Sequence, residues 1–163
     1  MLRERTLTIN KDELFRILIS EVTEILKTNL NRAAKLKTIC KLLENKVPYY
    51  NWVGFYAVDK ERADQLVLVS FEGEPTEHVR IPFGKGICGQ AASLQRIYVV
   101  QDVSKEVNYL SCSSKVKSEI VIPILKNDMI VGELDIDSHV TSPFTSHDKN
   151  YLTIIAKMAS ELL

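Results

Sequence analysis

Cys88 and Cys112 have the two settings in this sequence that suit redox chemistry. Cys88 lies in the glycine-rich stretch 84–89, whose spacing predicts a tight turn leading into a helix. Because the free N–H groups at the start of a helix stabilise a thiolate, we expect Cys88 to ionise and oxidise more easily than an ordinary cysteine. Cys112 lies in the polar stretch 110–114, which predicts a loop, and two lysines follow closely enough to favour ionisation. From its position alone, Cys112 is either a reactive thiol or a surface thiol without a role.

The third cysteine and the glycine spacing have structural interpretations. Cys40 lies on the apolar face of a predicted helix, where a buried cysteine behaves as a small hydrophobic residue. Gly84, Gly86 and Gly89 match the spacing G-x-G-x-x-G of dinucleotide-binding loops. No βαβ unit surrounds them and no acidic residue follows at the expected distance, so a tight turn is favoured over nucleotide binding. Three cysteines are also too few for a disulfide framework, and an odd number cannot all be paired within the chain.

Three carboxylates form the other chemical signal. Asp135 and Asp137 flank Ile136 in a predicted strand, and residues two apart in a strand point to the same face. Glu119 opens the strand before it, and the tight turn 126–128 predicts a hairpin that brings Glu119 close to Asp137. These groups form either a solvated strand end or an acidic pocket that holds a substrate ammonium group or supplies a proton.

A metal site is a competing use of these carboxylates. His78, His139 and His147 are scattered, and no pair of them has the spacing of metal ligands, so a structural zinc site is not expected. No Ser-His-Asp arrangement is visible either.

Composition narrows the class of protein. The sequence has 163 residues, with 21 Lys plus Arg balanced by 21 Asp plus Glu, so nothing favours a nucleic-acid partner. The charged N-terminal stretch 1–15 is unlike a secretory signal, and no apolar stretch approaches the length that spans a membrane. We therefore expect a cytoplasmic protein.

Periodicity predicts an α+β fold with one central antiparallel sheet. Helices are expected at 10–26, 32–44, 90–94 and about 145–163, and strands at 52–58, 65–71, 79–81, 98–100, 118–125 and 129–137. We expect one domain over 1–163, with a helical segment 1–46, a sheet core at about 50–137 and a closing helix at about 145–163. Exposed apolar faces on the N-terminal helices would allow a homodimer.

Four motifs in order resemble the free methionine-(R)-sulfoxide reductases, a family of single GAF domains. The motifs are Asn51-Trp52-Val53-Gly54-Phe55-Tyr56, then Arg80-Ile81-Pro82-Phe83-Gly84-Lys85-Gly86-Ile87-Cys88-Gly89, then Ser118-Glu119-Ile120-Val121-Ile122-Pro123, then Leu134-Asp135-Ile136-Asp137-Ser138. The resemblance implies a GAF-like sheet with the N-terminal helices and the C-terminal helix packed on one face. The match runs from about Asn51 to the C-terminus.

The resemblance also implies roles for residues. Cys112 matches the cysteine that attacks the sulfoxide sulfur, and Cys88 matches a second cysteine able to form a disulfide with it. It implies that Glu119, Asp135 and Asp137 are carboxylates of the substrate pocket. It implies that Trp52 and Tyr56 form aromatic walls of that pocket, and that backbone groups around Ser113 and Ser114 contact the substrate. The family implies no bound cofactor and an external dithiol reductant such as thioredoxin.

One position departs from the family pattern. Members often carry a further cysteine just before the Arg-Ile-Pro segment, and His78 stands there in this sequence. Cys88 must then resolve the oxidised intermediate alone or with a small external thiol.

Two alternatives belong to other classes of function. A GAF module can bind a small ligand without catalysis, or the thiols can act as a redox sensor toward a partner protein. Both alternatives predict no turnover of free methionine sulfoxide.

Overall fold

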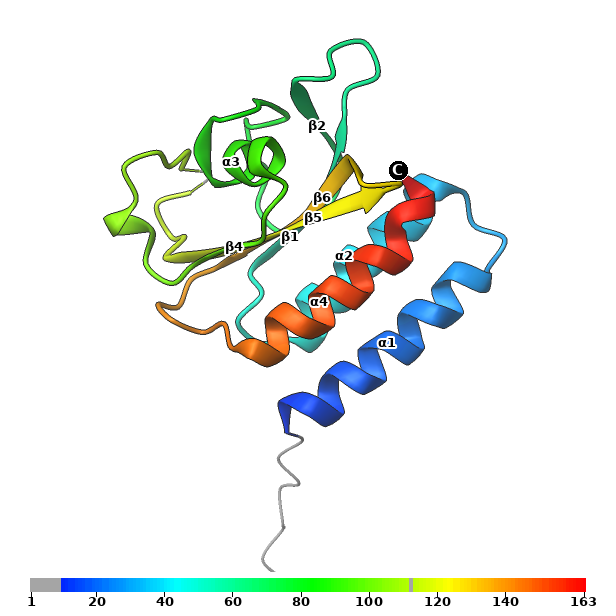
Figure 1. The fold of residues 1–163 in the computed structure, drawn as a ribbon. Helices are drawn as coiled ribbons and strands as arrows, with labels where there is room; N and C mark the ends of the chain where they lie inside the picture. The colour runs from blue at the N-terminus through cyan, green and yellow to red at the C-terminus, as the bar shows by residue number, and fades with distance from the viewer. Residues whose placement is uncertain (1–9, 112) are drawn as a thin grey trace, which may run out of the picture.

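The structure is a computed structural model that describes residues 10–111 and 113–163. The predicted α+β fold is confirmed, with the elements arranged as in Figure 1. The helices are α1 (Lys11–Lys27), α2 (Arg32–Lys46), α3 (Gly86–Leu94) and α4 (Ser146–Ala159), with the short 3₁₀ turns η1 (Val103–Lys105) and η2 (Ser160–Leu162). The strands are β1 (Trp52–Val58), β2 (Gln65–Glu72), β3 (Arg80–Pro82), β4 (Tyr98–Val100), β5 (Ser118–Lys126) and β6 (Met129–Ser138).

The strands of the described residues form one antiparallel sheet in the order β3-β2-β1-β6-β5-β4. The two longest, β5 and β6, are joined by a tight turn in which Asn127 and Asp128 both have positive φ. That turn is the hairpin connection predicted for 126–128, because such backbone angles match the twist of paired strands.

One face of the sheet is covered by α2 and α4, and α1 packs on the outer side of these two helices, as Figure 1 shows. Alternate strand residues point to this face, so Val53, Phe55, Ile120 and Ile136 pack against the apolar sides of the helices. This layer is the apolar core and contains none of the carboxyl groups of β5 and β6. The predicted packing of the terminal helices on one face is therefore confirmed.

Helix α3 lies on the opposite face and begins earlier than predicted, at Gly86 rather than Gln90. Gly86 has a φ of +62°, a backbone conformation that glycine adopts without strain. A Cβ at Gly89 would lie 2.5 Å from the carbonyl oxygen of Pro82, so the glycine allows α3 to pack directly on the preceding segment. The glycine spacing thus serves a tight turn, and it places Cys88 within the first turn of α3.

No helix in the described part of the chain is both long and apolar enough to cross a membrane.

Candidate active site

The face of the sheet under α3 carries the carboxyl groups. Register pairs Asp137 with both Glu119 on β5 and Trp52 on β1, and it pairs Glu133 with Tyr56. Since alternate residues share a face, Glu133, Asp135 and Asp137 of β6 all lie on this side together with Glu119. The predicted approach of Glu119 to Asp137 is therefore confirmed.

These carboxyl groups are buried. The exposed fractions are 6% for Glu119, 0% for Glu133, 2% for Asp135 and 1% for Asp137. A solvated strand end is thus excluded, and the acidic pocket is the arrangement that the chain adopts. Of the basic side chains that the structure describes, none forms an ion pair with any of these groups.

These carboxyl groups have raised pKa values, because they are buried and no basic side chain that the structure describes pairs with them. Desolvation raises the pKa of Asp135 to about 6. It raises the pKa values of Glu119 and Asp137 well above their ordinary range, and the negative charge of Asp135 adds to both shifts. Carboxylic acids with raised pKa values are suited to donate protons near neutral pH.

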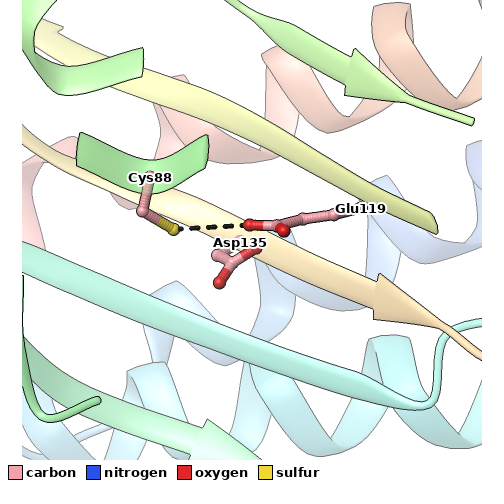
Figure 2. A group of neighbouring side chains, drawn as sticks. All are labelled: Cys88, Glu119 and Asp135. Carbon is pink, nitrogen blue, oxygen red and sulfur yellow. Dashed lines mark hydrogen bonds between the residues drawn. The ribbon is translucent and has the colours of Figure 1, made fainter. Parts of the chain in front are cut away.

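Cys88 reaches the same cluster from α3, as Figure 2 shows. Its Sγ donates a hydrogen bond to Glu119 Oε1 at 3.7 Å, and the carboxyl of Asp135 lies beside this pair. The side chain is only 4% exposed. Three elements, α3, β5 and β6, therefore place a thiol and two carboxyl groups in contact.

The prediction that Cys88 ionises easily is wrong. Burial raises the pKa of its thiol well above the ordinary value, and the charges of Asp135, Glu133 and Glu119 raise it further. A helix N-terminus stabilises an anion by only about 0.3–1 kcal/mol at an exposed site, so burial beside carboxyl groups outweighs it. Cys88 is a protonated thiol at neutral pH.

A pocket opens from this cluster toward the loop that precedes Cys112. It is lined by Tyr56, His78, Ile81, Lys85, Gly86, Ile87, Cys88, Leu110, Glu119 and Asp135. His78 Nε2 lies 3.0 Å from the carbonyl oxygen of Ser111, so it donates to that oxygen and ties the loop to the pocket. Cys112 itself lies outside the described residues, and its predicted role stays a prediction.

A second hollow adjoins the cluster on the side of Asp137. It is lined by Asn51, Trp52, Glu74, Ser113, Val116, Asp137 and His139. The ring of Trp52 stacks on Phe71 at 5.7 Å between centroids, and its Nε1 donates to the carbonyl oxygen of Glu74 at 3.0 Å. The predicted aromatic residues thus divide between the two hollows, with Tyr56 at the first and Trp52 at the second. Ser113 lines the second hollow, whereas Ser114 is exposed and lines neither.

Residues 10–163 match the family described as GAF domain. The chain belongs to the GAF domain family. The resemblance inferred from the four motifs is confirmed by relatives and solved structures that share most of this GAF domain.

Three relatives show how far the likeness extends. GAF domain-containing protein A of Dictyostelium discoideum is 38% identical over 149 residues, which cover 91% of this chain and 92% of that protein. Free methionine-R-sulfoxide reductase of Escherichia coli (strain K12) is 32% identical over 155 residues, which cover 95% and 92% of the two chains. The structure of free methionine-R-sulfoxide reductase from Neisseria meningitidis in complex with its substrate superposes with a TM-score of 0.86 at 34% identity, covering 94% and 90%.

In this GAF domain, Glu133 is a buried carboxyl group on the same face of the sheet that the sequence interpretation missed. It is fully buried, neither of its carboxyl oxygens has a hydrogen-bond partner among the described residues, and burial raises its pKa well above the ordinary value. The signal was present, because Glu133, Asp135 and Asp137 alternate along one strand and must share a face.

Proposed function

We propose that this GAF domain reduces free L-methionine-(R)-sulfoxide to L-methionine. The observation that carries the proposal is the contact of the Cys88 thiol with buried, proton-holding carboxyl groups in one pocket. A sulfoxide oxygen leaves only after it is protonated, and the substrate also brings an ammonium group that a carboxylate can hold. The relatives named free methionine-R-sulfoxide reductases add independent support.

The carboxyl groups divide the two tasks by their pKa values. Asp135, with a pKa of about 6, is ionised at neutral pH and is suited to the substrate ammonium group. Glu119 and Asp137 hold their protons to higher pH and are suited to protonate the sulfoxide oxygen. The ring of Tyr56 walls the pocket beside Cys88, the ring of Trp52 walls the adjoining hollow, and backbone groups around Ser113 help to hold the substrate.

The redox step uses two thiols and balances without a metal or bound cofactor. The Cys112 thiolate attacks the sulfoxide sulfur and forms a sulfur–sulfur bond, while the protonated oxygen leaves as water. Water then attacks the Cys112 sulfur, the sulfur–sulfur bond breaks, methionine leaves, and Cys112 becomes a sulfenic acid. The Cys88 thiol then attacks the Cys112 sulfur, water leaves, and a disulfide forms. An external dithiol such as thioredoxin supplies the two electrons that restore both thiols.

The cell compartment and the assembly follow as further parts of the proposal. Two thiols that must be reduced after each turnover suit the cytoplasm, where thioredoxin keeps cysteines reduced. The homodimer expected from the apolar faces of the N-terminal helices stays a prediction, which light scattering during size-exclusion chromatography tests.

The proposal is tested by turnover with each epimer of free methionine sulfoxide and a dithiol reductant. We expect the wild-type chain to consume the R epimer alone, and we expect Cys112→Ser to consume neither. Cys40→Ser is the matched control, because Cys40 is buried in the helical layer and should leave turnover unchanged. Binding of the substrate without turnover would instead support a ligand-sensing module, and full turnover by Cys112→Ser would contradict the assignment.

A further inference from the structure

The side chains of Cys88, Glu119 and Asp135 form a set of metal-ligand types inside the pocket. One ligand atom from each lies within 4.8 Å of the other two, and Cys88 Sγ lies 3.7 Å from Glu119 Oε1. Figure 2 shows the sulfur directed at the Glu119 carboxyl, with the Asp135 carboxyl beside them. We infer that this set binds one thiophilic divalent cation, Zn²⁺.

The spacing suits a tetrahedral ion. With Zn–S near 2.3 Å and Zn–O near 2.1 Å, ligand atoms on one tetrahedral Zn²⁺ lie roughly 3.4–3.6 Å apart. The Sγ–Oε1 distance of 3.7 Å is already close to that value. The remaining distances, all within 4.8 Å, need to shorten by about 1 Å, which rotation of a carboxyl group supplies. Three protein ligands leave the fourth position for water.

Unpaired oxygens supply the independent reason for a cation here. Asp135 is 2% exposed, and its Oδ1 has no hydrogen-bond partner within the described ranges. The neighbouring Glu133 is 0% exposed, and both of its oxygens are likewise unpartnered. Buried acceptors without partners are costly, so a bound cation lowers the free energy of this cluster.

The ligand types select among metals. A thiolate favours Zn²⁺ over Mg²⁺ and Ca²⁺, which prefer oxygen ligands alone. The sequence interpretation excluded structural zinc from the spacing of histidines. It could not detect this set, because the ligands come from α3, β5 and β6 and meet only in the folded chain.

Binding exchanges protons and moves no electrons. Zn²⁺ displaces the proton of the Cys88 thiol and the proton that Glu119 holds, and the metal–ligand bonds replace the Cys88–Glu119 hydrogen bond. The bound Cys88 is then withheld from disulfide formation. Metal binding does not require that the proposed reaction be correct, since the ligands stand in the structure without the substrate.

The test is competition for Zn²⁺ between the reduced, metal-free full chain and a chromophoric zinc chelator, with a reductant that contains no thiol. We expect one Zn²⁺ per chain. Losing an outer-shell partner already weakens metal binding by about 10–100-fold, so Cys88→Ser, Glu119→Gln and Asp135→Asn should each weaken it by at least about tenfold. Cys40→Ser and Cys112→Ser should bind as wild type. Mg²⁺ in millimolar excess should not displace Zn²⁺.

A second measurement guards against variants that fail to fold. The double variant Cys40→Ser/Cys112→Ser retains Cys88 as its only cysteine. With Co²⁺ in place of Zn²⁺, it should show a thiolate-to-metal charge-transfer band in the near ultraviolet. Absence of that band, absence of Zn²⁺ binding at micromolar concentrations, or binding that is lost in Cys112→Ser would overturn the assignment. Metal binding without any turnover would leave it standing and would contradict only the proposed reaction.

Discussion

The thiol of Cys88 donates to Glu119 Oε1 at 3.7 Å, so the sulfur that we propose as the resolving thiol and a carboxyl group with a raised pKa are direct neighbours. Burial raises the pKa of both groups, and the charge of Glu119 raises the pKa of the Cys88 thiol further. In the proposed reaction, this contact places the acid that protonates the sulfoxide oxygen next to the second thiol.

The variant Glu119→Gln tests the role of Glu119 as the acid and its effect on the pKa of Cys88. We expect kcat/KM for free methionine-(R)-sulfoxide to fall by about 10²–10⁴-fold, because the variant lacks the acid. The pKa of Cys88 should fall at the same time, since one negative neighbour is gone. Exposed Glu106 provides the control Glu106→Gln, which should change neither quantity. Wild-type kcat/KM in Glu119→Gln would show that another group donates the proton.

The pH dependence of kcat/KM should show the ionisation of Asp135. Its ionised form is assigned to the substrate ammonium group, and its pKa is about 6. Protonation removes that charge, so kcat/KM should decline as the pH falls through about 6. The profile of Asp135→Asn should lack this acid-side decline and stay low throughout. A wild-type profile that is flat between pH 5 and pH 7 would contradict the assignment.

Glu133→Met should stabilise the chain. Replacing a buried, unpartnered carboxyl with an apolar side chain of similar length is expected to raise the free energy of unfolding by about 1–3 kcal/mol at neutral pH. The folded-state pKa of Glu133 is raised, so the native carboxyl is increasingly destabilising as the pH rises above its unfolded value near 4.5. The gain should therefore be larger at pH 8 than at pH 5. Urea unfolding at both pH values measures it, and a gain that shrinks with rising pH would contradict this reasoning.

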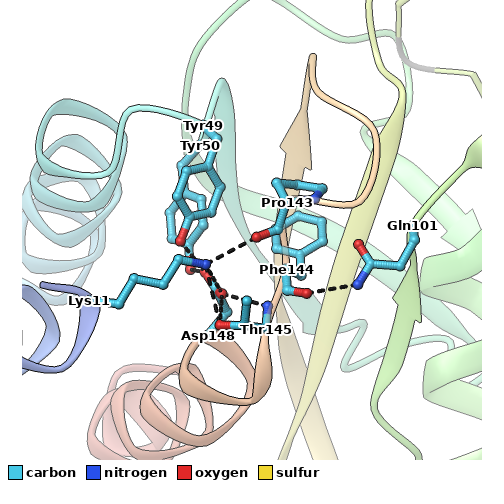
Figure 3. Close-up of polar contacts among 8 residues, drawn as sticks. All are labelled: Lys11, Tyr49, Tyr50, Gln101, Pro143, Phe144, Thr145 and Asp148. Atoms are coloured by element: carbon cyan, nitrogen blue, oxygen red, sulfur yellow. Dashed lines mark hydrogen bonds and ion pairs between the residues drawn. The ribbon is translucent and has the colours of Figure 1, made fainter.

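Asp148 holds the N-terminal ends of α1 and α4 together. It does not line the pocket, and its role is structural. Figure 3 shows Asp148 accepting from Tyr49, Tyr50, Lys11 and the backbone N–H of Thr145. Burial acts to raise its pKa, but these donors together hold the pKa below the ordinary value. The network is built on the capping box at the start of α4, which Thr145 and Asp148 form.

Asp148→Asn should destabilise the fold by about 2–4 kcal/mol at pH 7, because it leaves Lys11 and the two tyrosines without their charged acceptor. A lowered folded-state pKa adds stability above the unfolded pKa and loses it as the pH falls through the folded value. The difference between variant and wild type should therefore shrink on acidification. Thermal unfolding at several pH values measures this, with the exposed Asp64→Asn as control. A difference independent of pH would point to packing alone.

Much of the fold could be predicted because short sequence patterns determine where the helices start and where the strands turn. The Asn10 side chain caps α1 by accepting from the backbone N–H of Glu13 at 2.8 Å, and an Asn followed three residues later by Glu is a local sequence pattern for such a cap. The turn between β5 and β6 set the register that pairs Glu119 with Asp137. Alternation along β6 then placed Asp135 and Asp137 on one face.

What sequence could not supply was burial. The ionisation of Cys88 was misjudged because the carboxyl groups around it come from β5 and β6, and only the folded chain excludes water from them. The start of α3 was misplaced because glycine is a poor helix former, whereas Gly86 opens the helix with a positive φ. The role of Cys112 rests on resemblance, since that residue lies outside the described ranges.

The most direct test of the proposed chemistry is a reaction of the fully reduced chain with free methionine-(R)-sulfoxide and no added reductant, followed by mass spectrometry of its peptides. We predict one methionine released per chain and a disulfide joining Cys88 to Cys112, with Cys40 still a free thiol. Methionine formed while both Cys88 and Cys112 remain reduced, or no methionine from a folded chain that binds the sulfoxide, would contradict the mechanism.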